Sequence, residues 1–437
     1  MMQLLSVIGT GYLGTTHAAC MASLGFEVIG IDTDPAKIAL LSAGKLPFYE
    51  PGLQELLQEQ IASGRLTFST DYSLIQGADV HFVCVGTPQI ADGLAADLTY
   101  VEQALASVTP YLKSGSLVVG KSTVPVGTAE KLALALSVGA PQAELAWNPE
   151  FLREGFAIQD TLRPTRLVIG VTSDRAEKVL QEVYSSLIKT GTPWIRADLP
   201  TSEIVKVAAN SFLATKISFI NAMAEVCEAS GADVTVLAEA IGYDPRIGNK
   251  FLQAGIGFGG GCLPKDLRAF MARADELGAT QALQFLREID AINLRARRRV
   301  IDVVRTILGE NLSGKEIAVL GAAFKPESDD IRDSPALEIA EQLFAAGAKI
   351  RVHDPKAMEN SKRRYPLFEY RQNPEDCIAG SDLVLHLTEW SIYRELNPAQ
   401  LALHVKNAAI IDGRNTLDRE KWIAAGWKFH SVGRKNA

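Results

Sequence analysis

Short continuous apolar runs alternate along the chain with longer stretches in which apolar residues recur every three or four positions. The chain opens with an apolar run at 4–8, a helical stretch that reaches Leu24, and a second apolar run at 26–32. Further runs that predict strands lie at 80–85, 117–120 and 167–170. Strands that alternate with helices form parallel sheets covered on both faces. We therefore predict a parallel, doubly wound sheet over roughly the first 195 residues.

The middle of the chain is helical. Apolar residues from Thr201 to about Gly231 recur at helical spacing, and residues 281–308 form another long helical pattern without Gly or Pro. The strand-helix-strand order then returns, with strands expected at 316–321, 349–354, 383–386 and 408–411 and a helix at 336–346. We expect a second sheet of the same kind after the second long helix.

The predicted fold class is α/β, with two Rossmann-like doubly wound domains joined by a helical central domain that includes a long linking helix. A chain of 437 residues is too long for one ordinary hydrophobic core, which favours several domains. We place a Rossmann-like domain at 1–199, a helical central domain at 200–310, and a second Rossmann-like domain at 311–437.

The loop after the first strand carries the glycine pattern of a dinucleotide-binding site. Gly9, Gly11 and Gly14 lie between a strand and a helix, and Asp32 ends the next strand. The glycines permit a tight turn, close approach of a pyrophosphate and close helix packing. Asp32 would accept hydrogen bonds from ribose hydroxyls and repel a 2′-phosphate, so we predict NAD rather than NADP. The equivalent segment of the second sheet, 321–325, lacks this pattern, and we expect that domain to have lost dinucleotide binding.

Several loops that directly follow predicted strands are candidates for ligand binding. Gly86-Thr-Pro88 and Ser122-Thr-Val-Pro125 follow strands of the first sheet. In the second sheet, Thr388-Glu-Trp390 and Asp412-Gly-Arg-Asn415 occupy the same kind of position. Ligands of doubly wound sheets bind at the carboxyl ends of the strands, so these positions favour binding over ordinary loops.

The composition excludes several classes of function. A net charge of -7 gives no electrostatic reason to bind nucleic acid or an anionic membrane. No signal sequence or run of about 18 apolar residues is present, so we expect a cytoplasmic protein. The five cysteines and six histidines lack the spacing of disulfide frameworks or metal ligands, and we predict no metal site. We expect His17 and His81 in the core, and Arg295 with Arg297-Arg-Arg299 on a solvated face.

Cys262 ends a run of glycines that begins at Gly255, and Lys265 and Asp266 follow it. Glycines let the backbone approach an anion closely, and a thiol near a cationic amine ionises more readily to the reactive thiolate. The segment alone leaves two interpretations open. One is a nucleophile held against a phosphate-bearing substrate, and the other is a buried cysteine in a Gly-rich surface loop. Upstream, Lys206 and Asn210 are spaced i,i+4 on a helix and point the same way.

NAD together with a nucleophilic cysteine indicates oxidation beyond the aldehyde. A hydride leaves only from an sp³ carbon that bears oxygen, so an aldehyde must first add a nucleophile. A thiolate supplies it, giving a thiohemiacetal, which loses a hydride to form a thioester and is then hydrolysed to an acid. These steps use two molecules of NAD per substrate.

The chain resembles the nucleotide-sugar dehydrogenases that make uronic acids, the UDP-glucose/GDP-mannose dehydrogenase family. The matching motifs are Gly9-x-Gly-x-x-Gly14, Glu50-Pro-Gly-Leu53, Ser122-Thr-Val-Pro125, Asn148-Pro-Glu-Phe-Leu-Arg-Glu-Gly155, Lys206-x-x-x-Asn210, Arg246-Ile-Gly248, Gly257-Phe-Gly-Gly-Gly-Cys-Leu-Pro-Lys-Asp266, Lys325 through Arg332-Asp-Ser-Pro335, and Asp412-Gly-Arg414. The resemblance implies NAD-dependent, four-electron oxidation of UDP-glucose to UDP-glucuronate through a thiohemiacetal and a thioester on Cys262. The same chemistry on dTDP-glucose, GDP-mannose or a UDP-N-acetylhexosamine is the alternative.

The resemblance also implies residue roles, with Cys262 as nucleophile, Lys206 and Asp266 assisting proton transfer, and Glu150 acting on the hydrolytic water. The expected catalytic residues are Cys262, Lys206, Asp266, Glu150, Thr123 and Asn210. The expected NAD-binding residues are Gly9, Gly11, Tyr12, Leu13, Gly14, Asp32, Lys37, Gly86, Thr87, Thr123, Glu154, Cys262, Lys265 and Arg332. The expected substrate-binding residues are Glu150, Phe151, Leu152, Glu154, Lys206, Asn210, Arg246, Asn249, Phe251, Gly259, Lys325 and Arg414. Arg246 is expected to reach the site of a neighbouring subunit, which implies a homodimer or higher homo-oligomer built on the central helices.

Some alternatives stay open. Gly261 stands where the family frequently has a small polar residue, and Thr165 stands where Asp is common. Residue by residue, Glu150 and Glu154 can be read as helix-start acids, and Lys325 and Arg414 as solvated charges at strand ends. A two-electron hydroxyacid dehydrogenase with a structural cysteine, or a silent NAD-binding regulator, are the alternative functions.

Overall fold

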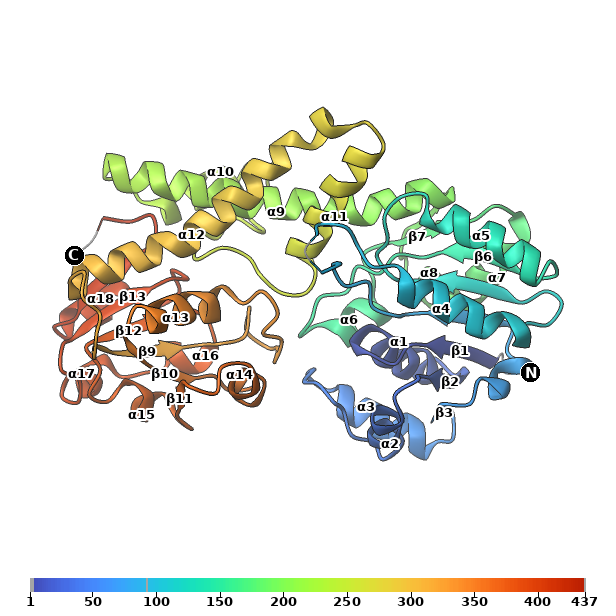
Figure 1. Ribbon diagram of the computed structural model, residues 1–437, viewed down its shortest axis with the longest axis horizontal. Helices are drawn as coiled ribbons and strands as arrows, with labels where there is room; N and C mark the ends of the chain where they lie inside the picture. Colours follow the sequence, from blue (N-terminus) through green and yellow to red (C-terminus); the bar gives the residue numbers. More distant parts are fainter. Residues whose placement is uncertain (1–3, 92, 436–437) are drawn as a thin grey trace. The chain divides into compact units, whose positions relative to one another are not determined.

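The structure is a computed structural model in which residues 4–91 and 93–435 are described. The chain forms two compact units, an N-terminal unit of residues 1–209 with 268–278 and a C-terminal unit of residues 210–267 with 279–437. Figure 1 shows that each unit contains a sheet covered by helices. The division into 1–199, 200–310 and 311–437 stays a prediction, and its outer ranges include residues 1–3, 92 and 436–437, which lie outside the described residues.

The N-terminal unit contains an eight-stranded sheet in the order β3-β2-β1-β4-β5-β6-β7-β8. Its strands are β1 (Leu4–Ile8), β2 (Glu27–Ile31), β3 (Leu66–Ser69), β4 (Val80–Val83), β5 (Leu117–Gly120), β6 (Glu144–Trp147), β7 (Leu167–Gly170) and β8 (Trp194–Ala197). All neighbouring strands pair in parallel except β6 and β7, which are antiparallel. The predicted doubly wound sheet is confirmed, but it is not parallel throughout.

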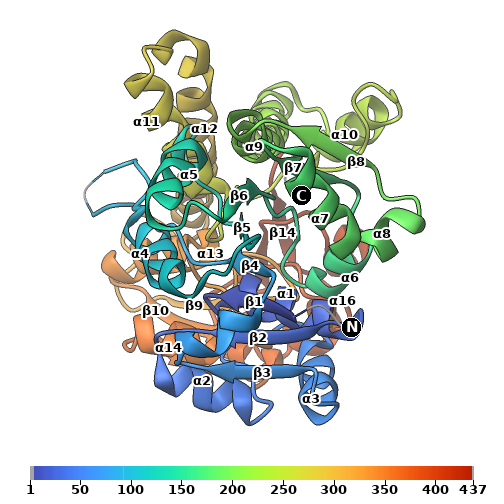
Figure 2. The ribbon, with the colours of Figure 1, turned by 90° about the vertical axis from the view of Figure 1, so that its right-hand side faces the viewer.

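Helices cover both faces of this sheet. They are α1 (Tyr12–Ser23), α2 (Pro35–Ser42), α3 (Leu53–Ala62), α4 (Thr99–Val108), α5 (Thr128–Gly139), α6 (Ala157–Leu162), α7 (Asp174–Val183) and α8 (Ser185–Lys189), with 3₁₀ turns at Tyr72–Gly77 and Thr109–Tyr111. Successive side chains of a strand point to opposite faces, and in β5 Leu117 and Val119 enter one core while Val118 enters another. The first core packs α1, α3 and α7 on the sheet, and the second packs α4 and α5 (Figure 2).

Both long helices predicted for the middle of the chain are confirmed, and the structure adds two shorter helices between them that were not predicted. They are α9 (Leu199–Ser230), α10 (Val234–Gly242), α11 (Leu263–Glu276) and α12 (Gln284–Leu308), and a 3₁₀ turn at Thr280–Leu283 precedes α12. None of the described helices is both long enough and apolar enough to cross a membrane.

The C-terminal unit contains the second predicted sheet. Its six strands are all parallel, in the order β11-β10-β9-β12-β13-β14. They are β9 (Glu316–Leu320), β10 (Lys349–His353), β11 (Glu369–Tyr370), β12 (Leu383–His386), β13 (Ala409–Asp412) and β14 (Lys428–Ser431). Its helices are α13 (Pro335–Ala345), α14 (Met358–Arg364), α15 (Pro374–Ile378), α16 (Ser391–Arg394), α17 (Pro398–Ala402) and α18 (Arg419–Ala424).

Arg297 on α12 does not lie on a solvated face, so that expectation was wrong for this residue. The residue is fully buried, and its guanidinium pairs with Asp333 at 2.7 Å and with Glu338. It also donates to the carbonyl oxygen of Phe258 at 2.8 Å. Burial would lower the pKa of Arg297, but the two carboxylates raise it overall. Helical spacing alone does not reveal this, because the neighbouring Arg298 is exposed.

We therefore expect R297M to destabilise the protein by about 3–5 kcal/mol, since removing one partner of a buried ion pair leaves the other charges uncompensated. The matched variant R298M should change stability by less than about 0.5 kcal/mol, as is usual for an exposed position. Urea unfolding of the two variants measures this difference. Equal stability of R297M and R298M would contradict the proposed contribution of Arg297.

Candidate active site

The glycine loop of the N-terminal unit has the shape of an anion cradle. Gly9 has φ +87°, and a Cβ at Gly14 would lie 1.8 Å from the carbonyl oxygen of Gly9, so both positions require glycine. A Cβ at Gly11 or Gly86 would have no neighbour within 4 Å. The open space beside this backbone, at the start of α1, fits the pyrophosphate of a dinucleotide, which helix N-termini favour.

Asp32 is held in place at the end of β2. Its Oδ2 accepts hydrogen bonds from the N–H of Thr10 at 2.8 Å and the hydroxyl of Thr10 at 3.1 Å. Lys37 forms an ion pair with the same oxygen at 2.8 Å. Burial would raise the pKa of Asp32, but Lys37 and the backbone N–H donors lower it overall. The structure thus brings Asp32 and Lys37 together, as an ionised acceptor suited to ribose hydroxyls.

Glu50 joins the first helix to the segment that contains Glu154. Its carboxylate accepts hydrogen bonds from the N–H groups of Gly155 at 2.6 Å and Ala157 at 2.7 Å, and from the hydroxyl of Tyr12. Burial and Glu50 together raise the pKa of Tyr12 well above its ordinary value. This contact gives the Glu50-Pro-Gly motif a role that the sequence had not indicated.

The two loops after β4 and β5 are joined to each other. The hydroxyl of Thr87 donates to the carbonyl oxygen of Thr123 at 2.7 Å, and that of Ser122 donates to Val85 at 2.6 Å. Both loops lie at the carboxyl edge of the sheet, as predicted, and these hydrogen bonds hold them together.

Glu203 on α9 fixes the end of the loop that contains Thr123. It accepts hydrogen bonds from the N–H groups of Gly127 and Ala129, both at 2.7 Å, at the start of α5. Burial raises the pKa of Glu203 to about 7, although these donors oppose the shift. Sequence reasoning missed Glu203 because its partners lie far away along the chain.

Glu150 and Phe151 are adjacent residues of the N-terminal unit, and two cations lie against the Phe151 ring. Oε1 of Glu150 accepts the N–H groups of Phe151 at 2.8 Å and Leu152 at 3.0 Å. The guanidinium carbon of Arg166 lies 3.9 Å from the centre of the Phe151 ring, and Nζ of Lys206 lies 5.4 Å from it. The ring thus contacts two cations, an arrangement that stabilises both. Arg166 was not predicted, although it follows the unusual Thr165.

Cys262 lies in the C-terminal unit directly before α11, and its side chain is exposed. The N–H of Asp266 donates to the carbonyl oxygen of Cys262 at 2.9 Å, which places the cysteine at the N-cap of the helix. The helix dipole favours an anionic sulfur there. Cys262 is therefore not the buried structural cysteine of the alternative interpretation, whereas the other four cysteines are buried.

Asp266 is buried beside Cys262 and contacts two further predicted residues. Its Oδ2 accepts a hydrogen bond from Nδ2 of Asn210 at 2.7 Å. Its Oδ1 pairs with Nζ of Lys265 at 2.8 Å. The structure thus brings Cys262, Lys265, Asp266 and Asn210 together within one unit.

The backbone that leads to Cys262 is fixed by side chains from neighbouring helices. Oδ1 of Asn221 on α9 accepts the N–H of Gly255 at 2.8 Å. Asn293 on α12 exchanges two hydrogen bonds with the backbone of Phe258, at 2.7 and 3.0 Å. The N–H of Gly260 donates to the carbonyl oxygen of Arg332 at 2.9 Å.

Arg332 also accounts for the unusual Gly261. A Cβ at Gly261 would lie 2.3 Å from the guanidinium carbon of Arg332. A side chain at this position would have to displace Arg332, which pairs with Asp330 at 2.6 Å. The departure from the family pattern therefore coincides with a close contact one residue before Cys262.

Arg414 contacts three separate loops of the C-terminal unit. Its guanidinium donates to the carbonyl oxygens of Leu387 at 2.7 Å, Gly257 at 3.2 Å and Phe324 at 3.3 Å. It also lies 3.3 Å from Glu389. Arg414 is therefore not the solvated charge of the alternative interpretation, and it places the Lys325 loop beside the Cys262 loop.

Three further predicted substrate residues of this unit, Arg246, Asn249 and Phe251, lie on an exposed segment after α10. Arg246 is exposed and pairs with Asp244 at 2.7 Å. Asn249 is exposed as well, and Phe251 has φ +64°, which is strained for a residue with a side chain.

Asp354 occupies in the second sheet the position that Asp32 has in the first, yet it is fully buried. Its Oδ2 accepts the N–H groups of Ala322 at 2.8 Å and Ala323 at 3.0 Å, together with the indole N–H of Trp390. Its Oδ1 accepts two more backbone N–H groups, at Lys356 and Ala357. No acceptor capacity is left for a ribose, which supports the predicted loss of dinucleotide binding.

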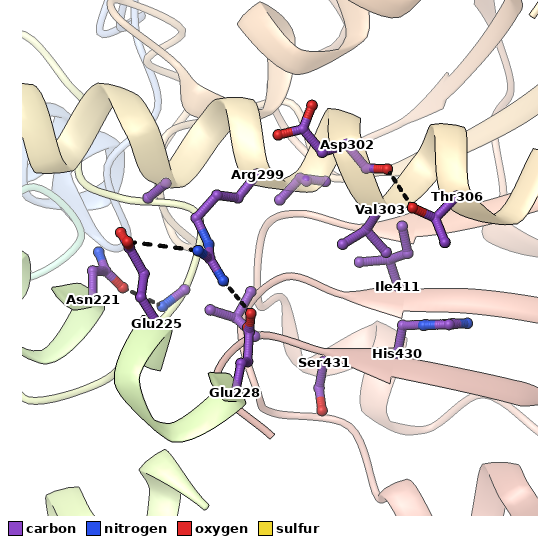
Figure 3. Close-up of a pocket in the computed structure, with 14 residues that line it drawn as sticks. Asn221, Glu225, Glu228, Arg299, Asp302, Val303, Thr306, Ile411, His430 and Ser431 are labelled. Carbon is purple, nitrogen blue, oxygen red and sulfur yellow. Dashed lines mark hydrogen bonds and ion pairs between the residues drawn. The ribbon is translucent and has the colours of Figure 1, made fainter. Parts of the chain in front are cut away.

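A cavity of about 260 Å³ lies in the C-terminal unit among α9, α12 and the strands β13 and β14. Figure 3 shows Arg299 between Glu225 and Glu228 along its wall. Gly255 is part of the lining. The ion pairs of Arg299 with Glu225 and Glu228 join α9 to α12. They line the same cavity as Gly255, where the Cys262 loop begins. Among residues 4–91 and 93–435, no three His, Cys, Asp or Glu side chains are grouped as metal ligands.

Three family models match the chain in succession. The NAD binding domain of the UDP-glucose/GDP-mannose dehydrogenase family matches residues 3–188, its central domain residues 200–295, and its UDP binding domain residues 318–419. The first match agrees with the glycine cradle and Asp32, and the N-terminal unit binds NAD.

Relatives match over nearly the whole chain. UDP-glucose 6-dehydrogenase TuaD of Bacillus subtilis (strain 168) is 40% identical, covering 99% of this chain and 94% of that protein. UDP-glucose 6-dehydrogenase of Rhizobium meliloti (strain 1021) is 39% identical, covering 98% and 99%. The solved structure of a UDP-glucose dehydrogenase from Pyrobaculum islandicum matches with a TM-score of 0.91 and 36% identity, covering 100% of this chain and 98% of that one. The chain therefore belongs to the UDP-glucose/GDP-mannose dehydrogenase family.

Proposed function

We propose that the protein oxidises UDP-glucose to UDP-glucuronate with two molecules of NAD. The observation that supports this most strongly is the exposed Cys262 at a helix N-terminus, beside Asp266, Asn210 and Lys265. It occurs in a chain whose full-length relatives, at 39–40% identity, are UDP-glucose 6-dehydrogenases. A two-electron alcohol dehydrogenase makes no use of a nucleophilic thiol, whereas in a four-electron oxidation the thiol can add to the aldehyde and prepare it for the second hydride loss.

In the first oxidation, the sugar alcohol becomes an aldehyde. NAD, when bound, accepts a hydride from the sugar carbon in each oxidation. Lys206 and Asp266 act on the sugar oxygen, where the departing proton and the developing negative charge need an acceptor and a nearby cation. The carboxylate of Asp266, held by Asn210 and Lys265, is already oriented for this task.

In the second oxidation, the sulfur of Cys262 adds to the aldehyde carbon and gives a thiohemiacetal. Loss of a hydride from this carbon, with the hydroxyl proton passing to solvent by way of Lys206 and Asp266, leaves a thioester on Cys262. Water then adds to the thioester carbon, the C–S bond breaks, and its electron pair leaves on the sulfur of Cys262. Glu150 directs this water, and Thr123 helps to position it.

The binding roles remain those that the family resemblance implies. We propose that Phe151, Leu152, Phe251, Gly259, Lys325 and Arg414, with Asn249 and Glu154, hold the nucleotide sugar, and that Arg332, Thr87 and Lys37 join the NAD site. For Arg414, the carbonyl contacts to Gly257 and Phe324 support an action through the loops that it holds. A cytoplasmic location also remains a prediction.

The identity of the sugar is open to direct test. A solved structure that is 28% identical, with a TM-score of 0.87, is a UDP-D-ManNAc dehydrogenase from Pyrococcus horikoshii, so the same fold serves other nucleotide sugars. NADH release with UDP-glucose, dTDP-glucose, GDP-mannose and UDP-N-acetylhexosamines should be greatest with UDP-glucose. A clear preference for another member of this panel would replace the substrate and leave the chemistry intact.

We expect two NADH per UDP-glucose from the wild-type protein. Cys262→Ser should lower UDP-glucuronate release by about 10³-fold or more, as when an enzyme loses its nucleophile, while NADH from the first oxidation is still formed. Product analysis together with NADH absorbance measures both quantities.

The control is Cys377→Ser, because the buried Cys377 donates to the carbonyl of Arg351 and a serine hydroxyl can do the same. One NADH per substrate, unaffected by Cys262→Ser, would favour the two-electron alternative, and NAD binding without turnover would favour the regulator.

We also propose a homodimer built on α9. Phe212, Phe219 and Val226 are 67%, 46% and 57% exposed, and their spacing places them along one side of the helix. Exposed apolar residues in such a row are typical of a helix that packs on another chain.

We expect Phe219→Asp to shift the protein toward monomer, because a carboxylate in an apolar interface is desolvated without a partner. Size-exclusion chromatography with light scattering measures the mass. Leu403→Asp is the control, since Leu403 is 80% exposed and lies outside the central helices. An unchanged dimer in Phe219→Asp would exclude this surface.

A further inference from the structure

Lys121 is a buried lysine in direct contact with the carboxylate proposed to act on the hydrolytic water. It follows β5 directly, and its side chain is only 3% exposed. Its Nζ lies 3.0 Å from Oε2 of Glu150 and donates to Oδ1 of Asn148 at 3.0 Å. Burying an ammonium group is costly unless it is paired, and here the pair supplies compensation.

The position of Lys121 is fixed by the sheet. Its N–H donates to the carbonyl oxygen of Val83 at 2.9 Å. Its partner Asn148 donates through Nδ2 to Val168 at 3.0 Å and accepts the hydroxyl of Tyr184 at 2.7 Å. The ammonium group therefore has little freedom to leave Glu150.

Every oxygen of Glu150 is engaged, but the carboxylate is not sealed off. Oε1 accepts the two backbone N–H groups of Phe151 and Leu152, and Oε2 faces Lys121. The side chain remains 18% exposed, so the residue is still in contact with solvent. Burial would raise the pKa of Glu150, but Lys121, the backbone donors and Lys206 lower it overall.

The other titratable groups around this pair are neutral near pH 7. They are His17 and Cys20 on α1, Cys84 after β4, and Tyr184 after α7. Burial lowers the pKa of His17 well below its ordinary value, and raises the pKa of Cys20, Cys84 and Tyr184 to about 12. The charges that act on Glu150 are therefore those of Lys121 and, more weakly, Lys206.

We propose that Lys121 is a positioning residue for the second half of the reaction, which keeps Glu150 ionised and oriented toward the hydrolytic water. The proposal rests on the proposed function. In the hydrolysis, one proton of the water passes by way of Glu150 to solvent, and the other stays with the new carboxyl group until that group ionises. A neutral Glu150 cannot accept this proton. The first oxidation uses no such water, so it does not depend on Lys121.

The test is Lys121→Met, which removes the charge and keeps most of the side-chain volume. Without the ammonium group, burial raises the pKa of Glu150, so Glu150 is protonated at the lower pH values and regains its charge as the pH rises. In a single turnover with NAD and UDP-glucose, quenched in acid, intact mass should show acylated Cys262 accumulating at pH 7. Its hydrolysis should be at least about tenfold slower than in wild type, and should recover by about tenfold per pH unit below the raised pKa of Glu150.

The controls separate positioning from general damage. Lys121→Arg keeps the charge and should restore the wild-type pH profile, whereas Glu150→Gln should be slow at every pH. In the ligand-free protein, the infrared difference between Lys121→Met and Lys121→Met/Glu150→Gln at pH 7 should contain a protonated carboxyl band that the wild-type pair lacks. If Lys121→Met folds poorly, Lys121→Gln serves for the same measurements.

A pH profile of Lys121→Met parallel to that of wild type, or an equal fall in the rate of the first oxidation, would overturn the proposal. So would a protonated Glu150 in the wild type. If neither the wild-type protein nor Lys121→Met forms acylated Cys262 from UDP-glucose, the proposed function fails instead, and the infrared result still reports whether Lys121 controls the charge of Glu150.

Discussion

The geometry around Cys262 depends on how closely the backbone of residues 255–260 approaches its neighbours. A Cβ would lie 2.7 Å from the carbonyl oxygen of Gly413 at Gly255, 2.5 Å from Oδ1 of Asn293 at Gly257, and 2.1 Å from the carbonyl oxygen of Asp333 at Gly259. Glycine at these positions therefore serves packing against protein as much as access for an anion. Helix α12, the loop after β13 and the loop before α13 all converge on this one stretch of backbone.

In both units a buried cation is paired with nearby acceptors. Arg297 is buried against two carboxylates and a carbonyl in the C-terminal unit, and Lys121 is buried against Glu150 and Asn148 in the N-terminal unit. In each case a cation fixes a segment that carries residues of the candidate site. Such pairs add little net stability compared with apolar packing, but they define one arrangement of the chain.

The sequence predicted what depends on local order and left out what depends on contacts between distant segments. The apolar runs located β1, β5 and β7, and the glycine pattern with Asp32 located the cofactor loop, because spacing along the chain carries these signals. The antiparallel pairing of β6 with β7 was not predicted, because the apolar pattern of a strand does not show its direction in the sheet. Arg297 looked like its exposed neighbours, and Lys121 and Glu203 carried no motif, since their partners are far away in sequence. A charged residue directly after a buried strand, as at Lys121, was the available signal.

Asp354 shows that an acid at the end of the second strand does not by itself indicate a dinucleotide site. Like Asp32, it lies at the end of the second strand of a strand-helix-strand unit. Its carboxylate accepts hydrogen bonds from two N–H groups of the turn after β9. The acid at this place thus holds the adjoining turn in both sheets, and Asp32 differs in that its Oδ1 accepts a single backbone N–H, from Asp34, which leaves capacity for a ribose hydroxyl. Introducing glycines into residues 321–325 would therefore not create a second dinucleotide site. The carboxylate of Asp354, which would have to bind the ribose, already accepts hydrogen bonds from the protein backbone.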